Sequence, residues 1–120
     1  MQTHIMSTPE AAEYYFKEGC HILELSNSVA DPTVSIARAR VVSGVTTQWH
    51  YLIDTTERYV ILQGQGDVEL ANTQRQTVQA GDVVIIPPFC WQRISNTGVQ
   101  DLIFLAICSP RFLAENYVSA

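Results

Sequence analysis

Hydrophobic and polar residues alternate along most of the chain, and this alternation predicts β-strands. The candidate strands are 21–25, 34–42, 46–53, 58–64, 67–71, 76–80, 83–86, 90–95 and 101–108. Turn-forming groups separate them, among them Ser43-Gly44, Gly81-Asp82 and Asn72-Thr73-Gln74. About eight or nine short strands with a turn every 8–12 residues is the rhythm of an all-β sandwich or barrel.

The two ends of the chain predict different structures. Ser7-Thr8-Pro9-Glu10 offers a hydroxyl cap, a proline and an acid, so we expect a short helix that reaches about Phe16. Residues 111–117 follow Pro110 and are expected to form a short tail outside the barrel. The segment 83–86 is apolar at every position, which predicts a strand buried on both faces. We expect one domain over residues 1–120, with its barrel core at about 20–110.

Composition removes several classes of function. The hydrophobic share of 47% is enough for a folded core, and the net charge of −5 comes without any basic run. Nucleic acid is therefore not an expected partner. No apolar run approaches the roughly 20 residues of a membrane span, and the start lacks the pattern of a signal peptide. Three widely spaced cysteines without a CxxC pair fit a reducing compartment, so we expect a cytoplasmic protein with no membrane partner.

Two blocks of residues resemble the signature motifs of the cupin family. The first motif has the form G-x5-H-x-H-x(3,4)-E-x6-G, and its positions here are Gly44, His50, Glu57 and Gly64. The second has the form G-x5-P-x-G-x2-H-x3-N, and its positions here are Gly81, Pro87 and Asn96. Together the motifs cover residues 44–96, and the chain resembles the small single-domain bacterial cupins. This resemblance implies a double-stranded β-helix, the jelly-roll barrel.

Three positions depart from the motifs. Metal-binding cupins use three histidines and one glutamate, but Leu52 occupies the second His position and Gln92 the last. Phe89 stands at the glycine of the second motif. The resemblance therefore implies a divalent metal held by His50, Glu57 and Gln92, with iron, manganese, nickel or zinc as candidates and no organic cofactor. The alternative is a hydrogen-bonded polar cluster without a metal, in which His50 pairs with Glu57.

Strand alternation places the same residues together without the resemblance. Side chains two apart on a strand share a face, so His50, Glu57, Tyr59 and Gln92 are expected to look into one pocket. The remaining predicted pocket residues are Arg40, Gln48, Leu52, Ile61, Ile94 and Phe104. Arg40 at the mouth would bind a carboxylate. The alternative for Arg40 is a surface pair with Arg38, facing acidic neighbours.

Several functions remain open at this point. The first is a metal-dependent enzyme acting on a small polar molecule, of dioxygenase, isomerase, decarboxylase or lyase type, with Glu57 and Tyr59 as catalytic residues. The second is a binding or sensing module without chemistry, and the third is an interaction protein whose pocket has no function. A homodimer is expected, with Trp49, Trp91 and Phe112 as outward-facing anchors.

Overall fold

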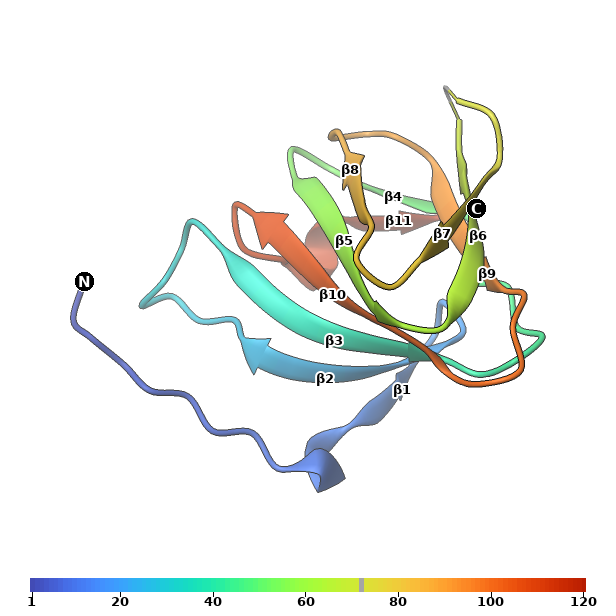
Figure 1. Cartoon of the computed structure of the whole chain (residues 1–120). Helices are drawn as coiled ribbons and strands as arrows, with labels where there is room; N and C mark the ends of the chain where they lie inside the picture. The colour runs from blue at the N-terminus through green and yellow to red at the C-terminus, as the bar shows by residue number, and fades with distance from the viewer. Residues whose placement is uncertain (72) are drawn as a thin grey trace.

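The computed structural model describes residues 1–71 and 73–120, which form two antiparallel β-sheets. The six-stranded sheet has the order β1-β2-β3-β10-β5-β8 and the five-stranded sheet the order β11-β4-β9-β6-β7 (Figure 1). The strands are β1 (Tyr14–Phe16), β2 (Cys20–Ser26), β3 (Ser35–Val41), β4 (His50–Leu52), β5 (Thr56–Gln63), β6 (Gln65–Leu70), β7 (Gln76–Gln79), β8 (Val83–Ile86), β9 (Gln92–Asn96), β10 (Leu102–Ser109) and β11 (Tyr117–Ser119). Strands distant in sequence are neighbours in both sheets, as a jelly roll requires, and the all-β prediction is confirmed.

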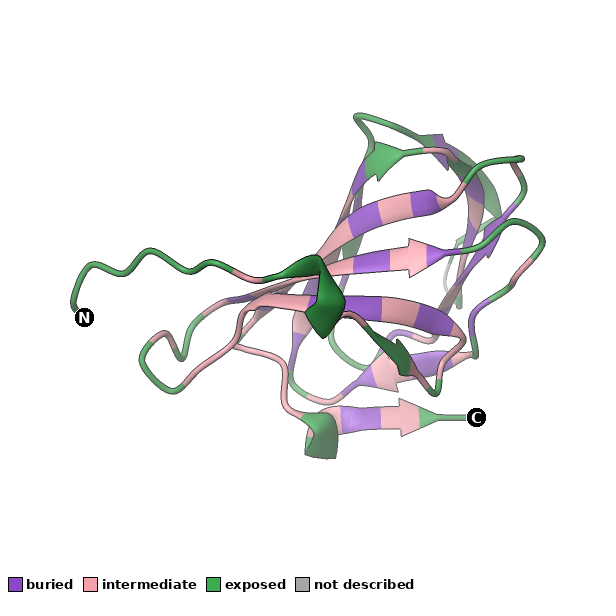
Figure 2. Cartoon of the chain, turned by 90° about the horizontal axis from the view of Figure 1, so that it is seen from below, coloured by how far each residue is buried: buried purple, intermediate pink, exposed green. Residues whose placement is uncertain are grey.

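The core lies between the facing sheets. Figure 2 shows buried and partly buried residues alternating along the strands, as expected when one face of each sheet packs inward. Val41, Ile61, Ile86, Ile94 and Leu102 are almost completely excluded from solvent. Apolar packing of this kind supplies the main favourable free energy of folding and leaves the barrel rigid enough to hold side chains in fixed positions.

Both ends of the chain differ from the prediction. The expected N-terminal helix is only a 3-10 turn, Glu10–Ala12, followed by β1, because three consecutive aromatic residues favour an extended strand paired with β2. The C-terminal segment is more than an outer tail. After a 3-10 turn at Ala114–Asn116 it forms β11, which pairs with β4 and closes the edge of the five-stranded sheet. This pairing brings Tyr117 opposite Leu52.

The expectation for residues 83–86 is also wrong. Val83 and Ile85 are 56% and 66% exposed, because β8 is the last strand of the six-stranded sheet and its outer side chains have no cover. Apolar residues at every position therefore do not mean burial on both faces in this strand.

None of the helices in the described part of the chain is long and apolar enough to cross a lipid bilayer.

Two motif positions have a clear backbone role. Gly64 adopts a φ of +87°, and a Cβ atom there would lie 2.8 Å from the carbonyl oxygen of Asp101, so only glycine fits. Phe89, at a position where the motif has glycine, adopts a φ of +63°. Phe89 thus has the left-handed backbone conformation that glycine adopts readily and that is uncommon for a bulky residue.

Candidate functional site

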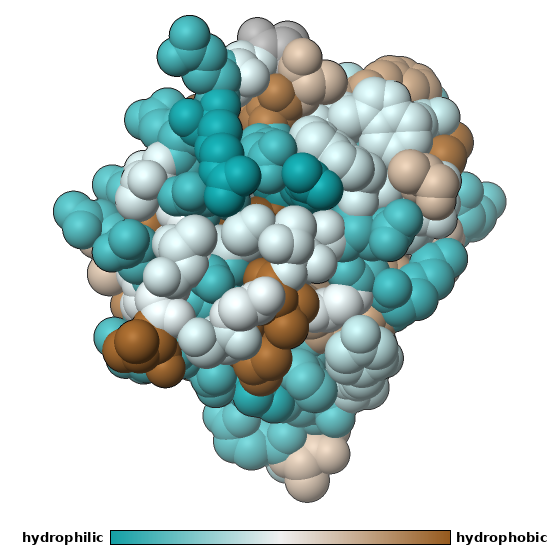
Figure 3. All heavy atoms as spheres, turned by 90° about the vertical axis from the view of Figure 1, so that its right-hand side faces the viewer, coloured by the Kyte–Doolittle hydropathy of each residue, from teal (hydrophilic) through white to brown (hydrophobic). Residues whose placement is uncertain are grey.

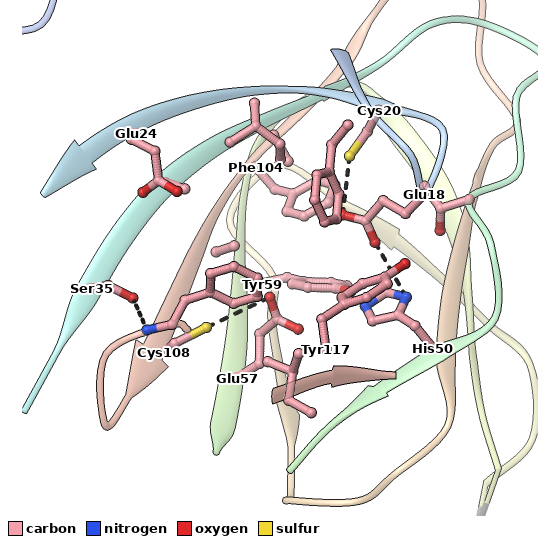
Figure 4. A pocket seen from close by; sticks show the side chains of 18 of the residues that line it. Glu18, Cys20, Glu24, Ser35, His50, Glu57, Tyr59, Phe104, Cys108 and Tyr117 are labelled. Carbon is pink, nitrogen blue, oxygen red and sulfur yellow. Dashed lines mark hydrogen bonds and ion pairs between the residues drawn. The ribbon is translucent and has the colours of Figure 1, made fainter. Parts of the chain in front are cut away.

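A cavity opens between the two sheets, and it contains the histidine and the glutamate of the first motif. Its empty volume is about 660 Å³, including the part of the mouth open to solvent. Its aromatic walls are Tyr14, Phe16, Tyr59, Phe104, Phe112 and Tyr117. Its acidic and basic side chains are Glu18, Glu24, His50 and Glu57 (Figure 4).

His50 is the first residue of β4 and is held firmly from one side. Its Nδ1 lies 2.9 Å from the backbone oxygen of Gln48 and 3.2 Å from Oε2 of Glu18. A carbonyl oxygen only accepts hydrogen bonds, so Nδ1 carries a hydrogen and Nε2 is the acceptor of the neutral ring. Tyr117 stacks on the imidazole, with 4.9 Å between the ring centroids. Cys20 donates from Sγ to Oε1 of Glu18 at 3.2 Å, which fixes the carboxylate that orients His50.

Glu57 on β5 is a buried carboxyl group with few partners. Its Oε1 is shielded from solvent and has no hydrogen-bond partner among the described residues, and Oε2 lies 3.8 Å from Sγ of Cys108. Burial raises the pKa of Glu57 to about 8, and the negative charge of Glu18 adds to this rise, whereas Gln92 and Cys108 oppose it. Glu57 is therefore mostly protonated at neutral pH and is able to donate a proton.

Tyr59, which lines the cavity, forms a hydrogen-bonded pair with Gln92. The Tyr59 hydroxyl donates to Oε1 of Gln92, and both side chains are almost fully buried. Burial raises the pKa of Tyr59 well above its ordinary value, so the phenol stays protonated and keeps its role as donor. The register pairs Gln92 with His50, which explains how the two motifs meet in space.

Most of the predicted pocket residues come together. His50, Leu52, Glu57, Tyr59, Ile94 and Phe104 all line the cavity. Gln92 and Ile61 lie just behind the wall and are 1% exposed. Strand alternation was sufficient to find these positions because β5, β9 and β10 follow it without interruption where they face the interior.

Two predicted pocket residues lie elsewhere. Gln48 is exposed and its amide donates to the backbone oxygen of Ala120 at 3.4 Å. The strand begins only at His50, so the alternation does not extend back to Gln48, and Thr47 faces inward instead. Arg40 is on the outer face of β3 and pairs with Glu13 at 2.6 Å and with Asp101 at 3.2 Å. The structure therefore places Arg40 among acidic neighbours on the outer face, as the surface-pair interpretation expects, and not among the residues that line the cavity.

Sequence reasoning missed the residues that come from the ends of the chain. Glu18 lies in the turn between β1 and β2, and Tyr117 lies in β11, so neither belonged to a predicted inward face. Glu24 and Cys108 were within reach of the same reasoning. Glu24 follows Cys20 and Ile22 at intervals of two on β2, and Cys108 follows Phe104 in the same way on β10.

Comparison with known proteins identifies the family. The family described as "Cupin domain" matches residues 38–108, which include both motifs. The chain belongs to the cupin family. The uncharacterized protein MJ1618 of Methanocaldococcus jannaschii is 33% identical to this cupin over 105 residues, which cover 86% of this chain and 83% of the archaeal protein.

Solved structures share the barrel. Streptomyces PAC13, called a nucleoside dehydratase and solved with uridine, has a TM-score of 0.78 at 17% identity and covers the whole chain, with 92% of its own length matched. A predicted oxalate decarboxylase from Thermotoga maritima has a TM-score of 0.78 at 23% identity, covering 89% of this chain and 99% of its own. At these identities the likeness extends to the fold, and the barrel alone does not set the reaction.

The donor groups fit a divalent metal poorly. The carbonyl oxygen of Gln92 accepts a hydrogen bond from Tyr59, and Leu52 offers no donor atom. Within residues 1–71 and 73–120, no three His, Cys, Asp or Glu side chains are placed to hold a metal ion together. His50 and Glu57 remain as two donors, and a catalytic zinc site uses three protein ligands. The metal site on His50, Glu57 and Gln92 stays a prediction.

Proposed function

We propose that this cupin binds a small hydroxyl-bearing molecule in the cavity and catalyses its isomerisation or dehydration by proton transfer. The proposal rests on one observation, that an acid and a base line the same cavity. Glu57 is a buried, protonated acid, and His50 is a base held in orientation by Glu18. An acid and a base with different environments in one site are typical of catalysis at neutral pH.

The proton transfers balance for a dehydration. Nε2 of His50 takes a proton from a carbon next to a carbonyl group of the substrate, and a carbon–carbon double bond forms as the neighbouring hydroxyl leaves. Glu57 gives its proton to the departing hydroxyl, which is released as water. His50 ends protonated and Glu57 ends ionised, and the proton returns to Glu57 through solvent or product. An isomerisation uses the same two groups without loss of water.

Tyr59 keeps its predicted catalytic role as part of this proposal. Its hydroxyl now donates to Gln92, so the phenol would turn to a developing oxyanion only when a substrate approaches. In the absence of substrate the bond fixes the ring against Phe104, with 4.4 Å between the ring centroids. The uridine bound by PAC13 supports the proposal in one respect, since it is a hydroxyl-bearing molecule held by a protein of the same fold.

The test is a reaction screen with matched variants. The purified protein is incubated with uncharged nucleosides, sugars and β-hydroxy carbonyl compounds, and the products are followed by NMR spectroscopy. We expect turnover that His50→Ala and Glu57→Gln remove and that the outer-face variant Glu13→Gln retains. Saturable binding without turnover would favour the non-catalytic binding module instead.

A metal-dependent reaction is the second candidate, because the unpartnered, buried Oε1 of Glu57 is a suitable ligand atom. The same screen with iron, manganese, nickel or zinc, and with a chelator, separates the two candidates. Turnover that requires added metal and ceases with chelator would replace the proton-transfer proposal with the metal-dependent one. Turnover that is unchanged by chelator supports the acid–base pair alone.

Assembly and location are also proposals. We propose a homodimer formed through the outer face of the six-stranded sheet, where Leu62, Val83 and Ile85 are exposed. The side of the molecule around β6, β7 and β9 presents a mainly polar surface with separate apolar spots (Figure 3). Cys20 and Cys108 are thiols, which supports a cytoplasmic location. Light scattering at micromolar concentration tests the dimer, and a monomeric mass would contradict it.

A further inference from the structure

The described residues of the cavity wall include three glutamates and one histidine but no lysine or arginine. Its carboxyl groups are Glu18, Glu24 and Glu57, and neither lysine nor arginine occurs among its described lining residues. The three are distributed along the cavity: Figure 4 shows Glu24 at one end, Glu18 beside His50 at the other, and Glu57 between them. A bound molecule therefore lies near a carboxyl group wherever it sits in the cavity.

The cations around the cavity are engaged outside it. Arg38 and Arg40 are both bound to Glu13 on the outer face, and Arg58 donates to Oγ of Ser109 at 2.6 Å. Lys17 is exposed, and its Nζ lies 4.9 Å from the ring centroid of Tyr117. None of the four lines the cavity, so no arginine or lysine there is available to neutralise an anionic ligand.

The free energy of binding in this cavity depends on the charge of the ligand. An anion would lose its hydration and meet only negative or neutral groups and the faces of aromatic rings, which repel it. An uncharged hydroxyl compound can donate hydrogen bonds to the carboxyl oxygens. A cation gains from the carboxylates and from the electron-rich faces of rings such as Tyr14, Phe112 and Tyr117.

We infer that the cavity selects its ligands by charge: it admits uncharged and positively charged small molecules and excludes carboxylates and phosphate esters. The inference rests on the proposed function in one respect: both assume that this cavity is the binding site. It narrows the substrate to uncharged or cationic hydroxyl compounds, and it sets this cupin apart from any relative whose substrate is a carboxylic acid.

A cysteine placed on the cavity wall measures this selectivity without knowledge of the substrate. Ala106 on β10 lines the cavity and is partly exposed, so Ala106→Cys places a small thiol there. The matched control is Ala80→Cys, which lies on the exposed surface next to β7. Each variant is treated with methanethiosulfonates of similar size that carry a trimethylammonium or a sulfonate group, and labelling of the new cysteine is followed by peptide mass spectrometry. Burial raises the pKa of the native Cys20 and Cys108, so these thiols react slowly.

We expect the cationic reagent to label Ala106→Cys faster than the anionic reagent does. The ratio of the cationic to the anionic labelling rate should be about tenfold larger at Ala106→Cys than at Ala80→Cys, because charge is poorly screened inside a cleft. Adding Glu24→Gln should lower this ratio severalfold, whereas adding Glu10→Gln on the outer face should leave it unchanged. Ala37→Cys repeats the test on the neighbouring strand, because Ala37 pairs with Ala106 and also lines the cavity.

Two results would overturn the inference. Equal ratios at the cavity and surface cysteines would show that the cavity has no charge preference. No labelling of either cavity cysteine by any reagent, in folded protein, would show that small molecules do not enter. These outcomes are independent of turnover in the His50 and Glu57 variants, so the inference and the proposed function can fail separately.

Discussion

Carboxyl groups on the two faces of the six-stranded sheet have opposite environments. On the outer face, Glu13 is bound by Arg40 and Arg38, and these hydrogen bonds lower its pKa to about 2. On the inner face, Glu57 has no cationic partner among the described residues, and burial raises its pKa to about 8. The sequence contains enough arginine to neutralise both, and the fold places it outside only. Paired charges of the outer kind hold a structure together, whereas unpaired buried acids are typical of functional sites.

The largest expected difference between the two faces is in turnover. We expect Glu57→Gln and His50→Ala to reduce the rate by about 10²–10⁴-fold, the range for loss of a general acid or base. Glu13→Gln removes a carboxylate from the outer face and should leave the rate within about twofold of wild type. Initial rates with a compound found in the reaction screen provide the measurement. Equal losses in the inner and outer variants would point to general destabilisation.

The next effect is a pH dependence of stability with opposite sign at the two sites. The pKa of Glu57 is higher in the folded than in the unfolded protein, so the fold loses stability as pH rises from about 4.5 through about 8. Glu57→Gln should therefore increase the free energy of unfolding at pH 9, by up to about 5 kcal/mol, and change it little below pH 4.5.

Glu13 provides the matched control for that series. Its pKa is lowered by folding, so its contribution is present above about pH 4.5 and is lost as pH falls through about 2. Glu13→Gln should reduce the free energy of unfolding at pH 7, by no more than about 1 kcal/mol, because the pair is partly exposed. Urea unfolding across the pH range measures both variants, and a Glu57→Gln variant that is less stable than wild type at pH 9 would refute the assignment.

A smaller effect tests whether Tyr59 and Gln92 form one unit. Tyr59→Phe leaves the buried carbonyl oxygen of Gln92 without its donor, which should cost about 1–3 kcal/mol of stability. Tyr15 offers a matched control on the outside, since it is 65% exposed, and Tyr15→Phe should change stability by less than about 0.5 kcal/mol. The double variant Tyr59→Phe, Gln92→Leu should recover part of the loss in urea unfolding. A purely additive double variant would mean that the two side chains act independently.

The smallest effect concerns the arginines of the outer face. Arg40→Gln removes the ion pairs with Glu13 and Asp101, and we expect a loss of about 1 kcal/mol or less that shrinks at high salt. Turnover and the labelling ratio of Ala106→Cys should not change, because Arg40 is outside the cavity. A loss of ligand binding in this variant would return Arg40 to the pocket and contradict the separation of the two faces.

The sequence predicted the positions of some side chains in the fold better than those of others. Residues in long alternating strands, such as Glu57, Tyr59 and Phe104, were placed correctly because side-chain direction follows from position in the strand. Gln48 was misplaced because β4 is too short for the alternation to reach it, and Arg40 because the alternation of one strand does not tell which of its two faces points inward. Glu18 lies in the turn between β1 and β2, and it was missed because a helix was expected where β1 forms. Tyr117 depends on the pairing of β11 with the distant strand β4, for which the local pattern contains no signal.

The measurement that tests the separation of the two faces most directly is the titration of individual glutamates by NMR spectroscopy. Protein labelled with ¹³C at the carboxyl carbon of glutamate is titrated between about pH 2 and pH 10, and Glu57→Gln and Glu13→Gln assign the two signals. We expect the Glu57 carboxyl group to titrate near pH 8 and the Glu13 carboxyl group near pH 2. A Glu57 signal that titrates near the ordinary value of 4.5 would contradict the buried acid on which the proposed chemistry depends.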